Sequence, residues 1–329
     1  MTSNITDNLP SDFTVGYYLS KSKVERLKWN SFVDMCKEKY NINCVPLDLE
    51  KDVSSYDKQP FHVFINKLTD ELGDLENIKN KTKIDKIQEL MKRFKTIVQV
   101  DSIEFQKSVL GRDVLSILLD KLNDSKEGGD FVKNPNFVLI DEQSQIKDYS
   151  ELLQKSDITF PCVCKPIKAC GSEESHFMGI VFRESDLHQF KLPMLIQQFI
   201  NHDGIIYKVF AIGDYIHVVH KKSIRNMNQN ETELIKFDSQ KPFPSTLLPT
   251  EDIESKVQTP NKETLKIVAQ NITKALGLTL FGFDVIIDSE TKKLAVVDIN
   301  YFPTYGGVQD FYKLLLEHSI NLYKQKINI

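Results

Sequence analysis

The first part of the chain alternates short apolar runs with longer stretches in which apolar residues recur every three or four positions. The apolar runs predict β-strands at 13–19, 43–47, 62–65 and 97–100. Helical spacing predicts amphipathic helices at 21–40, 78–94 and 112–122, the last of which ends before Gly128-Gly129. This β-α-β order favours a small parallel sheet covered by helices, an α/β fold whose ligands bind at the carboxyl ends of the strands.

From residue 137 onward the pattern changes to shorter strands with brief helices between them. Strands are predicted at 137–140, 161–165, 177–182, 195–199, 205–212 and 215–220, the last two forming a hairpin around Gly213-Asp214. The polar, proline-bearing segment 222–260 is predicted to contain a mobile loop. A final block predicts a helix at 262–276, strands at 280–287 and 294–299 around a turn at 288–292, and a helix at 308–323. This half of the chain therefore has an α+β character.

The composition is that of an ordinary globular chain. With 329 residues, 41% of them hydrophobic and 27% charged, the chain can form two or three domains with their own cores. Its 42 basic and 46 acidic side chains give a net charge of −4, which argues against a protein that coats nucleic acid with a basic face. A polyanionic ligand must therefore meet a local basic pocket.

The amino-terminal segment and the cysteines indicate a cytosolic setting. The first eight residues are polar and acidic and lack the features of a signal peptide. No apolar stretch approaches the roughly 18 residues that would cross a bilayer. The five cysteines are an odd number, and Cys162 and Cys164 alternate like one face of a strand, unlike a zinc knuckle. We therefore expect a cytosolic protein with reduced thiols and no membrane insertion.

The predicted hairpin near the end of the chain carries acidic residues inside apolar strands. Asp298 and Asn300 are two positions apart and so share a face, and a turn centred on Thr291 would place Asp284 opposite Asp298, about 5 Å away. Two carboxylates and an amide suit Mg²⁺, which leaves coordination positions open for nucleotide phosphates. Hairpin ends that are merely capped and hydrated are the alternative for such a pattern.

A lysine-bearing loop follows the predicted strand 161–165. Lys165 ends this strand, and the small residues of the loop that follows would let backbone N–H groups approach phosphates. Neither a P-loop motif nor the motif set of a protein kinase occurs in the chain. An ordinary lysine-bearing turn is the alternative.

Two further basic groups stand at predicted strand ends. Lys208 and the run 217–225 form a dense basic patch that suits an anionic ligand. Lys23 and Lys67 follow the first and third strands, where a parallel sheet could hold a polyphosphate. Solvated surface lysines are the alternative for both groups.

Taken in order, these motifs resemble those of the inositol 1,3,4-trisphosphate 5/6-kinase family, whose members are also described as inositol tetrakisphosphate 1-kinases. The resemblance runs from Gly16 to about Phe311. It rests on Gly16-Tyr17-Tyr18-Leu19-Ser20, Lys67-Leu68-Thr69-Asp70, Phe160-Pro161, Cys164-Lys165, Gly171 with Ser175-His176, the segment 197–202, Tyr207-Lys208-Val209-Phe210, Phe281-Gly282-Phe283-Asp284 and Asp298-Ile299-Asn300.

The resemblance implies an ATP-grasp fold with three domains. An N-terminal Rossmann-like α/β domain at 1–110 would contribute substrate lysines. A central domain at 111–200 and a C-terminal domain at 201–329 would sandwich ATP between their sheets, and the C-terminal domain would carry the magnesium site.

The resemblance also implies a role for individual residues. Inositol phosphate would be bound by Lys23, Lys67, His176, Lys208, Lys221 and Asn300. ATP would be bound by Arg112, Lys165, Gln197, Phe199, Lys208, Ser223 and Ser239. The metal ligands would be Asp284, Asp298 and Asn300, and no separate general base is assigned.

Four motifs depart from the pattern of the family. The family's Ala-His-Gly-Thr is here Ala169-Cys170-Gly171-Ser172, which removes one imidazole donor. Its Asp-Arg-Ser is Gly111-Arg112-Asp113, and a family glycine is Thr304, which we expect to narrow the space beside the substrate. A family arginine is Lys221, which cannot form a bidentate fork on a phosphate. These departures bear on the preferred isomer more than on the reaction.

The features together predict direct transfer of the γ-phosphate of ATP to a hydroxyl of an inositol tris- or tetrakisphosphate, with relaxed isomer preference and reversal by ADP. Two alternatives stay open, an ATP-grasp ligase that joins a carboxylic acid to an amine and a non-catalytic inositol phosphate-binding protein. The surplus of lysine and histidine favours the kinase, and the intact acidic hairpin argues against a non-catalytic protein. We expect a monomer that binds inositol polyphosphate, ATP and Mg²⁺, and neither nucleic acid nor membrane.

Overall fold

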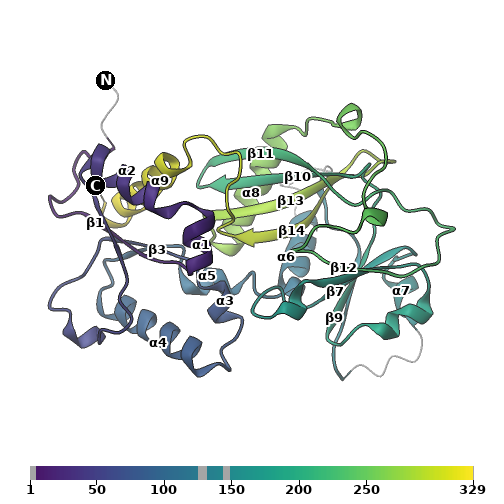
Figure 1. Ribbon diagram of the computed structural model, residues 1–329, viewed down its shortest axis with the longest axis horizontal. Helices are drawn as coiled ribbons and strands as arrows, with labels where there is room; N and C mark the ends of the chain where they lie inside the picture. Colours follow the sequence, from purple (N-terminus) through teal and green to yellow (C-terminus); the bar gives the residue numbers. More distant parts are fainter. Residues whose placement is uncertain (1–4, 125–131, 144–148, 329) are drawn as a thin grey trace.

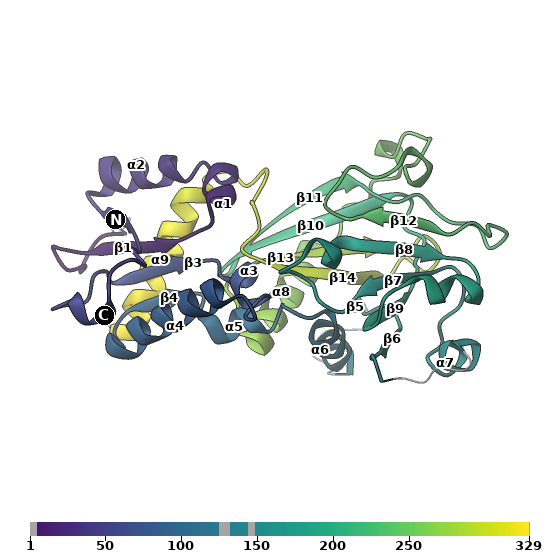
Figure 2. The ribbon, with the colours of Figure 1, turned by 60° about the horizontal axis from the view of Figure 1, so that its bottom comes forward.

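The computed structural model describes residues 5–124, 132–143 and 149–328. Within them the chain forms three β-sheets, one of four strands and two of five (Figure 1). The four-stranded sheet occupies one end of the elongated molecule, and the two five-stranded sheets occupy the other end (Figure 2). We refer to them as the N-terminal, central and C-terminal sheets.

The N-terminal sheet is parallel throughout, as predicted. Its strands in spatial order are β2 (Asn43–Pro46), β1 (Thr14–Tyr18), β3 (Val63–Asn66) and β4 (Val98–Val100). Its helices are α1 (Lys21–Arg26), α2 (Trp29–Tyr40), α3 (Thr69–Leu72), α4 (Ile78–Arg93), α5 (Ile103–Lys107) and, from the far end of the chain, α9 (Phe311–Ile327). Helices α2 and α9 pack on one face of this sheet and α4 on the other, so apolar residues of β3 enter a core on each side (Figure 2).

The single helix predicted at 21–40 is wrong, because the chain breaks it into α1 and α2. Lys28 adopts a left-handed conformation with φ 48°, although it is neither glycine nor asparagine. The hydroxyl of Tyr312 on α9 lies at this break and donates to the carbonyls of Leu27 at 2.8 Å and Lys28 at 3.1 Å. The break lets Trp29 turn fully into the core. A contact between residues so distant in the chain leaves no local signal.

The central sheet is antiparallel. Its strands in spatial order are β12 (Ile235–Asp238), β8 (Phe177–Val181), β7 (Cys162–Pro166), β9 (Met194–Gln198) and β6 (Phe137–Ile140), with α7 (Tyr149–Lys155) packed against them. Cys162 and Cys164 are both buried on β7, as their alternation predicted, and all five cysteines have free thiols.

The C-terminal sheet carries the predicted hairpins. Its strands in spatial order are β11 (Tyr215–Lys222), β10 (Ile205–Ile212), β13 (Leu280–Ile287), β14 (Leu294–Tyr301) and β5 (Val132–Lys133), and its helices are α6 (Arg112–Asp124) and α8 (Lys262–Leu276). Helix α8 begins where the Asn261 side chain accepts from the N–H groups of Glu263 and Thr264, and it ends at Gly277, whose φ of 70° suits a C-cap. The last helix, predicted at 308–323, instead runs through α9 at Phe311–Ile327.

Several segments cross between the sheets. Strand β12 follows β11 in sequence but pairs with β8 of the central sheet, and β5 pairs with β14 of the C-terminal sheet. Helix α9 returns to the N-terminal sheet. The division into 1–110, 111–200 and 201–329 therefore stays a prediction. Among the helices in the described ranges, none is long and apolar enough to cross a membrane.

A buried aspartate joins the N-terminal and C-terminal sheets. Asp101 follows β4, and its carboxylate accepts from the backbone N–H groups of Thr279 at 2.7 Å and Leu280 at 3.0 Å, and from the Thr279 hydroxyl at 2.6 Å. Its own N–H donates to the Tyr301 hydroxyl at 2.5 Å, and that hydroxyl donates to the Asn66 carbonyl at 2.9 Å. The start of β13 and the end of β14 are thus tied to the ends of β3 and β4.

We predict that Asp101→Asn lowers the free energy of unfolding by about 2–3 kcal/mol, because the amide cannot accept from all three donors and burial prevents water from replacing the lost bonds. Urea denaturation followed by circular dichroism measures the change. Asp85→Asn, at an exposed site on α4, is the matched control and should stay within about 0.5 kcal/mol of the original protein. Equal losses in the two variants would contradict the prediction.

Candidate active site

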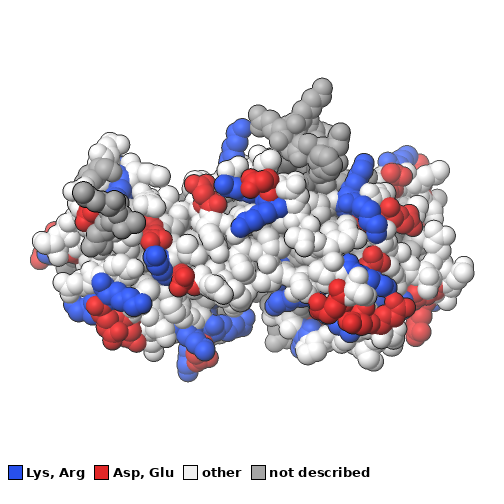
Figure 3. Space-filling view, turned by 90° about the horizontal axis from the view of Figure 1, so that it is seen from above, with Lys and Arg blue, Asp and Glu red and all other residues white. Residues whose placement is uncertain are grey.

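Basic residues are interspersed with acidic ones on the outer face seen in Figure 3, but they concentrate inside one cavity. The cavity has a volume of about 600 Å³ and is lined by strands of the central and C-terminal sheets. The segment 67–70 from the N-terminal sheet and the loop 239–243 complete its wall. All site residues predicted from sequence line it except Lys23.

The two predicted carboxylates face each other across the hairpin of β13 and β14. Asp284 pairs with Asp298, as expected, but by a different route from a symmetric turn. Near the turn the register is Val285 opposite Val296, so Val297 is an extra residue that forms a β-bulge. Since a shift of one residue reverses the face of every side chain, the bulge restores Asp298 to the face of Asp284.

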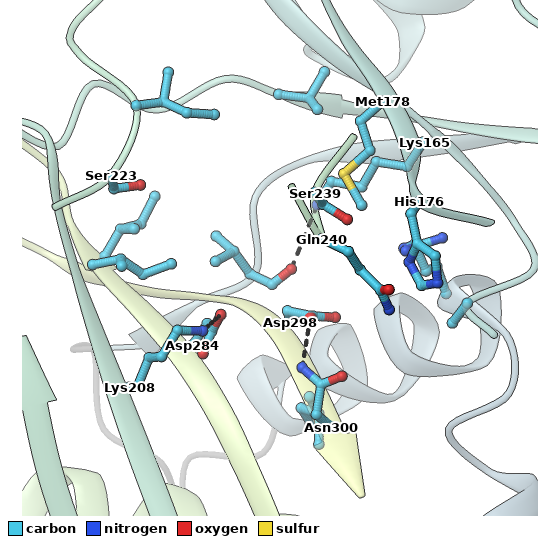
Figure 4. A pocket seen from close by; sticks show the side chains of 18 of the residues that line it. Lys165, His176, Met178, Lys208, Ser223, Ser239, Gln240, Asp284, Asp298 and Asn300 are labelled. Carbon is cyan, nitrogen blue, oxygen red and sulfur yellow. Dashed lines mark hydrogen bonds and ion pairs between the residues drawn. The ribbon is translucent and has the colours of Figure 1, made fainter. Parts of the chain in front are cut away.

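Each acidic group of the hairpin already has a partner. The Lys208 ammonium lies 2.6 Å from an oxygen of Asp284, and the Asn300 amide donates to Asp298 at 2.8 Å (Figure 4). Burial raises the pKa of Asp284, and the Lys208 charge opposes this rise. One face of the hairpin therefore presents two carboxylates and an amide oxygen, which are hard donors suited to a divalent cation.

Lys208 of β10 and Lys221 of β11, both in the predicted basic patch, line the cavity. In the register of β10 and β11, Lys208 is opposite Val219 and Ile206 is opposite Lys221, so the two lysines share the face that carries Asp284. Their charges add to the cavity from the side opposite Lys165.

Lys165 of β7 lies in the wall that the central sheet contributes. Its ammonium donates to the side-chain oxygen of Gln197 on β9 at 2.7 Å. Burial lowers the pKa of Lys165 to about 8, with Asp298 opposing and Arg112 reinforcing the shift. The amine is thus close to losing its charge when no anion is bound.

Arg112 has a different contact from the one expected. Its guanidinium is buried and donates to the carbonyls of Pro166 at 2.8 Å, Lys168 at 2.9 Å and Ser175 at 3.1 Å. It therefore shapes the loop between β7 and His176, and a direct contact with ATP stays a prediction.

An apolar slot forms the part of the cavity near the segment 199–202. Ser223 and His202 lie at its side, and the His202 ring is fixed because Nδ1 bonds the Ile200 carbonyl at 2.7 Å and Nε2 bonds the Ser223 hydroxyl at 3.2 Å. Burial lowers the pKa of His202, so the ring is neutral. The apolar residues of the slot are Val163, Met178, Phe199, Ile224, Phe237, Phe243 and Ile286.

The opposite end of the cavity is where the N-terminal sheet meets the loop 168–172. Lys67 lines it and donates to the Tyr301 carbonyl at 2.9 Å. Lys23 is buried behind it, with its ammonium on the carbonyls of Phe302 and Pro303. Burial and the neighbouring Lys67 lower the pKa of Lys23 to about 6.

Two positions that depart from the family pattern, Cys170 and Thr304, can be compared with this end of the cavity. The Cys170 thiol contacts the Thr69 carbonyl at 3.3 Å, and burial raises its pKa to about 11, so it stays a neutral thiol. Gly171 has φ 89°, and a Cβ there would lie 2.7 Å from the carbonyl carbon of Gly73, so the two segments touch through their backbones. Thr304 is exposed and is not among the described residues that line the cavity, contrary to the expected narrowing.

Two family models match the chain. The ATP-grasp domain of inositol 1,3,4-trisphosphate 5/6-kinase matches residues 126–321, and the pre-ATP-grasp domain of the same kinase matches residues 14–102. The chain belongs to the inositol 1,3,4-trisphosphate 5/6-kinase family.

Relatives in this family span nearly the whole chain. An inositol-tetrakisphosphate 1-kinase of Danio rerio is 36% identical over 314 residues, which cover 92% of this chain and 77% of that protein. The Xenopus laevis protein of the same name is 31% identical over 92% of this chain and 77% of its own length. An inositol-tetrakisphosphate 1-kinase 1 of Arabidopsis thaliana is 26% identical over 99% of this chain and 100% of its own length.

Solved structures confirm the predicted ATP-grasp fold. The D-alanine–D-alanine ligase of Bacillus anthracis superposes with a TM-score of 0.58 at 13% identity, covering 97% of this chain and 99% of the ligase. The ATP-grasp ligase PsnB, complexed with a minimal precursor, gives 0.58 at 10% identity, with 95% and 100% covered. At these identities the likeness concerns the fold alone.

Sequence reasoning missed three residues of this family member's site, Asp101, Tyr301 and Gln240. His202 was included in the segment 197–202 that carries the resemblance and in a turn, but it received no separate role. Asp101 acts from behind the cavity, Tyr301 lines it, and Gln240 lines it beside Ser239 (Figure 4). The available signal was for Asp101, an acid directly after an apolar strand.

Because the pKa of Lys165 is about 8, we predict that ADP affinity decreases as pH rises above about 8, by up to about tenfold per pH unit, since the amine loses the charge that binds phosphate. Calorimetric titration of ADP between pH 7 and 10 measures this. Lys165→Arg stays charged and should lose the dependence. Lys168→Arg, exposed in the same loop, should keep it, and a flat profile in the original protein would contradict the prediction.

Proposed function

We propose that this protein transfers the γ-phosphate of ATP to a hydroxyl of an inositol tris- or tetrakisphosphate. The observation that carries the proposal is the order of features along one cavity: an apolar slot, Lys165, the acidic hairpin and a basic end at Lys67. The relatives named inositol-tetrakisphosphate 1-kinase support it. A carboxylate–amine ligase would have no use for so many cations at the acceptor end.

Each part of the cavity has a matching part of the two substrates. The apolar slot beside Phe199 suits the adenine ring, with Ser223 at its side, and Ser239 lines the same cavity. Lys165 suits the ATP phosphates. Lys67, His176, Lys208 and Lys221 suit the several phosphates of the acceptor.

The donor set of the hairpin fits Mg²⁺. Asp284, Asp298 and Asn300 would hold the ion, which when bound would neutralise charge on the phosphates. In the structure, the Lys208 ammonium neutralises the charge of the Asp284 carboxylate. These residues do not include a softer sulfur or nitrogen donor, which argues for a hard cation.

The residues of the cavity act by position and charge. Phosphoryl transfer has a loose transition state and requires little base assistance, so aligned cations are sufficient. Burial, with Arg112 nearby, lowers the pKa of His176, which is therefore a neutral hydrogen-bonding group near the acceptor end. We assign no general base.

Four properties remain predictions that accompany this proposal. We expect the protein to work in the cytosol as a monomer, without binding nucleic acid. We also expect several inositol phosphate isomers to react, because lysines act as point charges and tolerate more than one orientation of the ring.

We predict that the protein phosphorylates inositol tris- and tetrakisphosphates with labelled ATP and Mg²⁺, and that Asp298→Asn lowers kcat by about 100-fold or more because a charge-stabilising ligand is lost. Glu290→Gln, exposed in the turn of the same hairpin, is the control and should retain activity. Amide formation from acids and amines, with no inositol product, would indicate a ligase. ATP binding with no product would indicate a non-catalytic protein.

We also predict reversal. Since product and ADP occupy the same two ends of the cavity, incubating the phosphorylated product with ADP and Mg²⁺ should yield ATP, detected by luciferase luminescence. Asp298→Asn should yield none above background. A complete absence of ATP from the active protein would contradict the prediction.

A further inference from the structure

The segment 199–204 connects β9 to β10 and carries Phe199 and His202, which line the apolar slot. It is held by a loop, within the segment 222–260, to which the sequence alone assigned no function. We call 199–204 the connector and 225–231 the clamp loop. Two asparagines, one in each segment, bind the backbone of the other segment.

Asn201 of the connector binds the main chain of Met227. Its amide donates to the Met227 carbonyl at 3.1 Å, and its oxygen accepts from the Met227 N–H at 2.8 Å. This two-bond contact fixes both segments in one register. The Asn201 carbonyl also accepts from the N–H of Ser289 at 2.8 Å, so the turn of the acidic hairpin is attached to the same residue.

Asn226 of the clamp loop binds the connector in return. Its oxygen accepts from the N–H groups of His202 at 3.0 Å and Asp203 at 2.8 Å, and its amide donates to the Asp203 carboxylate at 2.9 Å. Asp203 has φ 55°, a left-handed conformation that needs such support in a residue other than glycine.

The clamp loop is itself rigidly built. Arg225 forms a two-bond ion pair with Glu231, at 2.8 Å and 2.6 Å, and its Nε donates to the Thr246 carbonyl at 2.7 Å. The Met227 side chain is buried in one cluster with Phe199, which lines the slot. Movement of the clamp loop would therefore move the slot.

We propose that Asn201 and Asn226 are positioning residues, which form a reciprocal clamp that fixes the connector for the base of the bound nucleotide. The proposal rests on the proposed function for the identity of that nucleotide as ATP. The clamp contacts the apolar slot and not Lys165, so it acts on the base and leaves the phosphate end unchanged.

The test compares ADP with inorganic tripolyphosphate, which has no base, by calorimetric titration with Mg²⁺. Asn201→Ala should raise the Kd for ADP about tenfold and Asn226→Ala, which is more exposed, about threefold. The Kd for tripolyphosphate should stay unchanged. Asn228→Ala is the matched control, because this exposed neighbour has no side-chain hydrogen bond within the described ranges. Equal weakening of both ligands, or no weakening of ADP, would overturn the proposal.

A reversed pair separates positioning from loss of folding. Asn226→Asp places two carboxylates together and should weaken ADP binding. Combined with Asp203→Asn, it keeps the net charge, still accepts from the two N–H groups, and restores the side-chain bond with donor and acceptor exchanged. Asparagine also tolerates the left-handed conformation. The double variant should recover the original Kd for ADP, and failure to recover it in a folded protein would overturn the clamp.

Failure of the clamp and failure of the proposed function give different results. If the original protein binds ADP but phosphorylates no inositol phosphate, the kinase proposal fails and the binding data still decide the clamp. If it is an active kinase and Asn201→Ala leaves the Kd and the KM for ATP unchanged, the clamp alone fails. If the clamp acts as proposed, the KM for the inositol phosphate is the same in the clamp variants as in the original protein.

Discussion

The buried carboxylate of Asp101 is the contact on which the geometry of the cavity depends. The acidic hairpin belongs to the C-terminal sheet and Lys67 to the N-terminal sheet, so no strand pairing sets the distance between them. Asp101 sets it by binding the start of β13, while Tyr301 binds Asp101 and the residue before Lys67. A buried charge is tolerated only while its donors remain. Separating the two sheets would leave the Asp101 carboxylate without its hydrogen-bond donors. The acceptor end is therefore held at a fixed position relative to the hairpin.

Most of the cations around the cavity are hydrogen-bonded to an oxygen atom of the protein. Backbone carbonyls, an amide oxygen and one carboxylate serve in this way for Lys23, Lys67, Arg112, Lys165 and Lys208. These contacts reduce the repulsion among like charges packed in one place. When a polyanion binds, these cations exchange their internal oxygen partners for phosphate oxygens. Burial lowers the pKa values of Lys23 and Lys165, and the internal partners do not fully offset it.

Local pattern was enough to predict most strands of the three sheets and the pairing of Asp284 with Asp298, because period and turn position depend on neighbouring residues. It missed the edge strands β5 and β12, the second of which lies in the segment 222–260 that was predicted to contain a mobile loop. It failed where a distant residue decides. The break at Lys28 is contacted by Tyr312 from α9, far along the chain. The bulge at Val297 could not be distinguished from a symmetric turn that gives the same pair. The resemblance implied that Arg112 contacts ATP, which stays a prediction, and its carbonyl partners depend on a loop conformation that spacing does not reveal.

The return of α9 to the N-terminal sheet has a consequence for synthesis on the ribosome. One face of that sheet packs against Phe311–Ile327, and this helix is translated after the other two sheets. The strands of the N-terminal sheet therefore cannot complete this core until residues 311–327 have been translated. Folding from the amino terminus is delayed, and the nascent chain exposes an apolar surface while the rest is made. The N-terminal sheet and α9 must therefore acquire their final packing together, after α9 has been made.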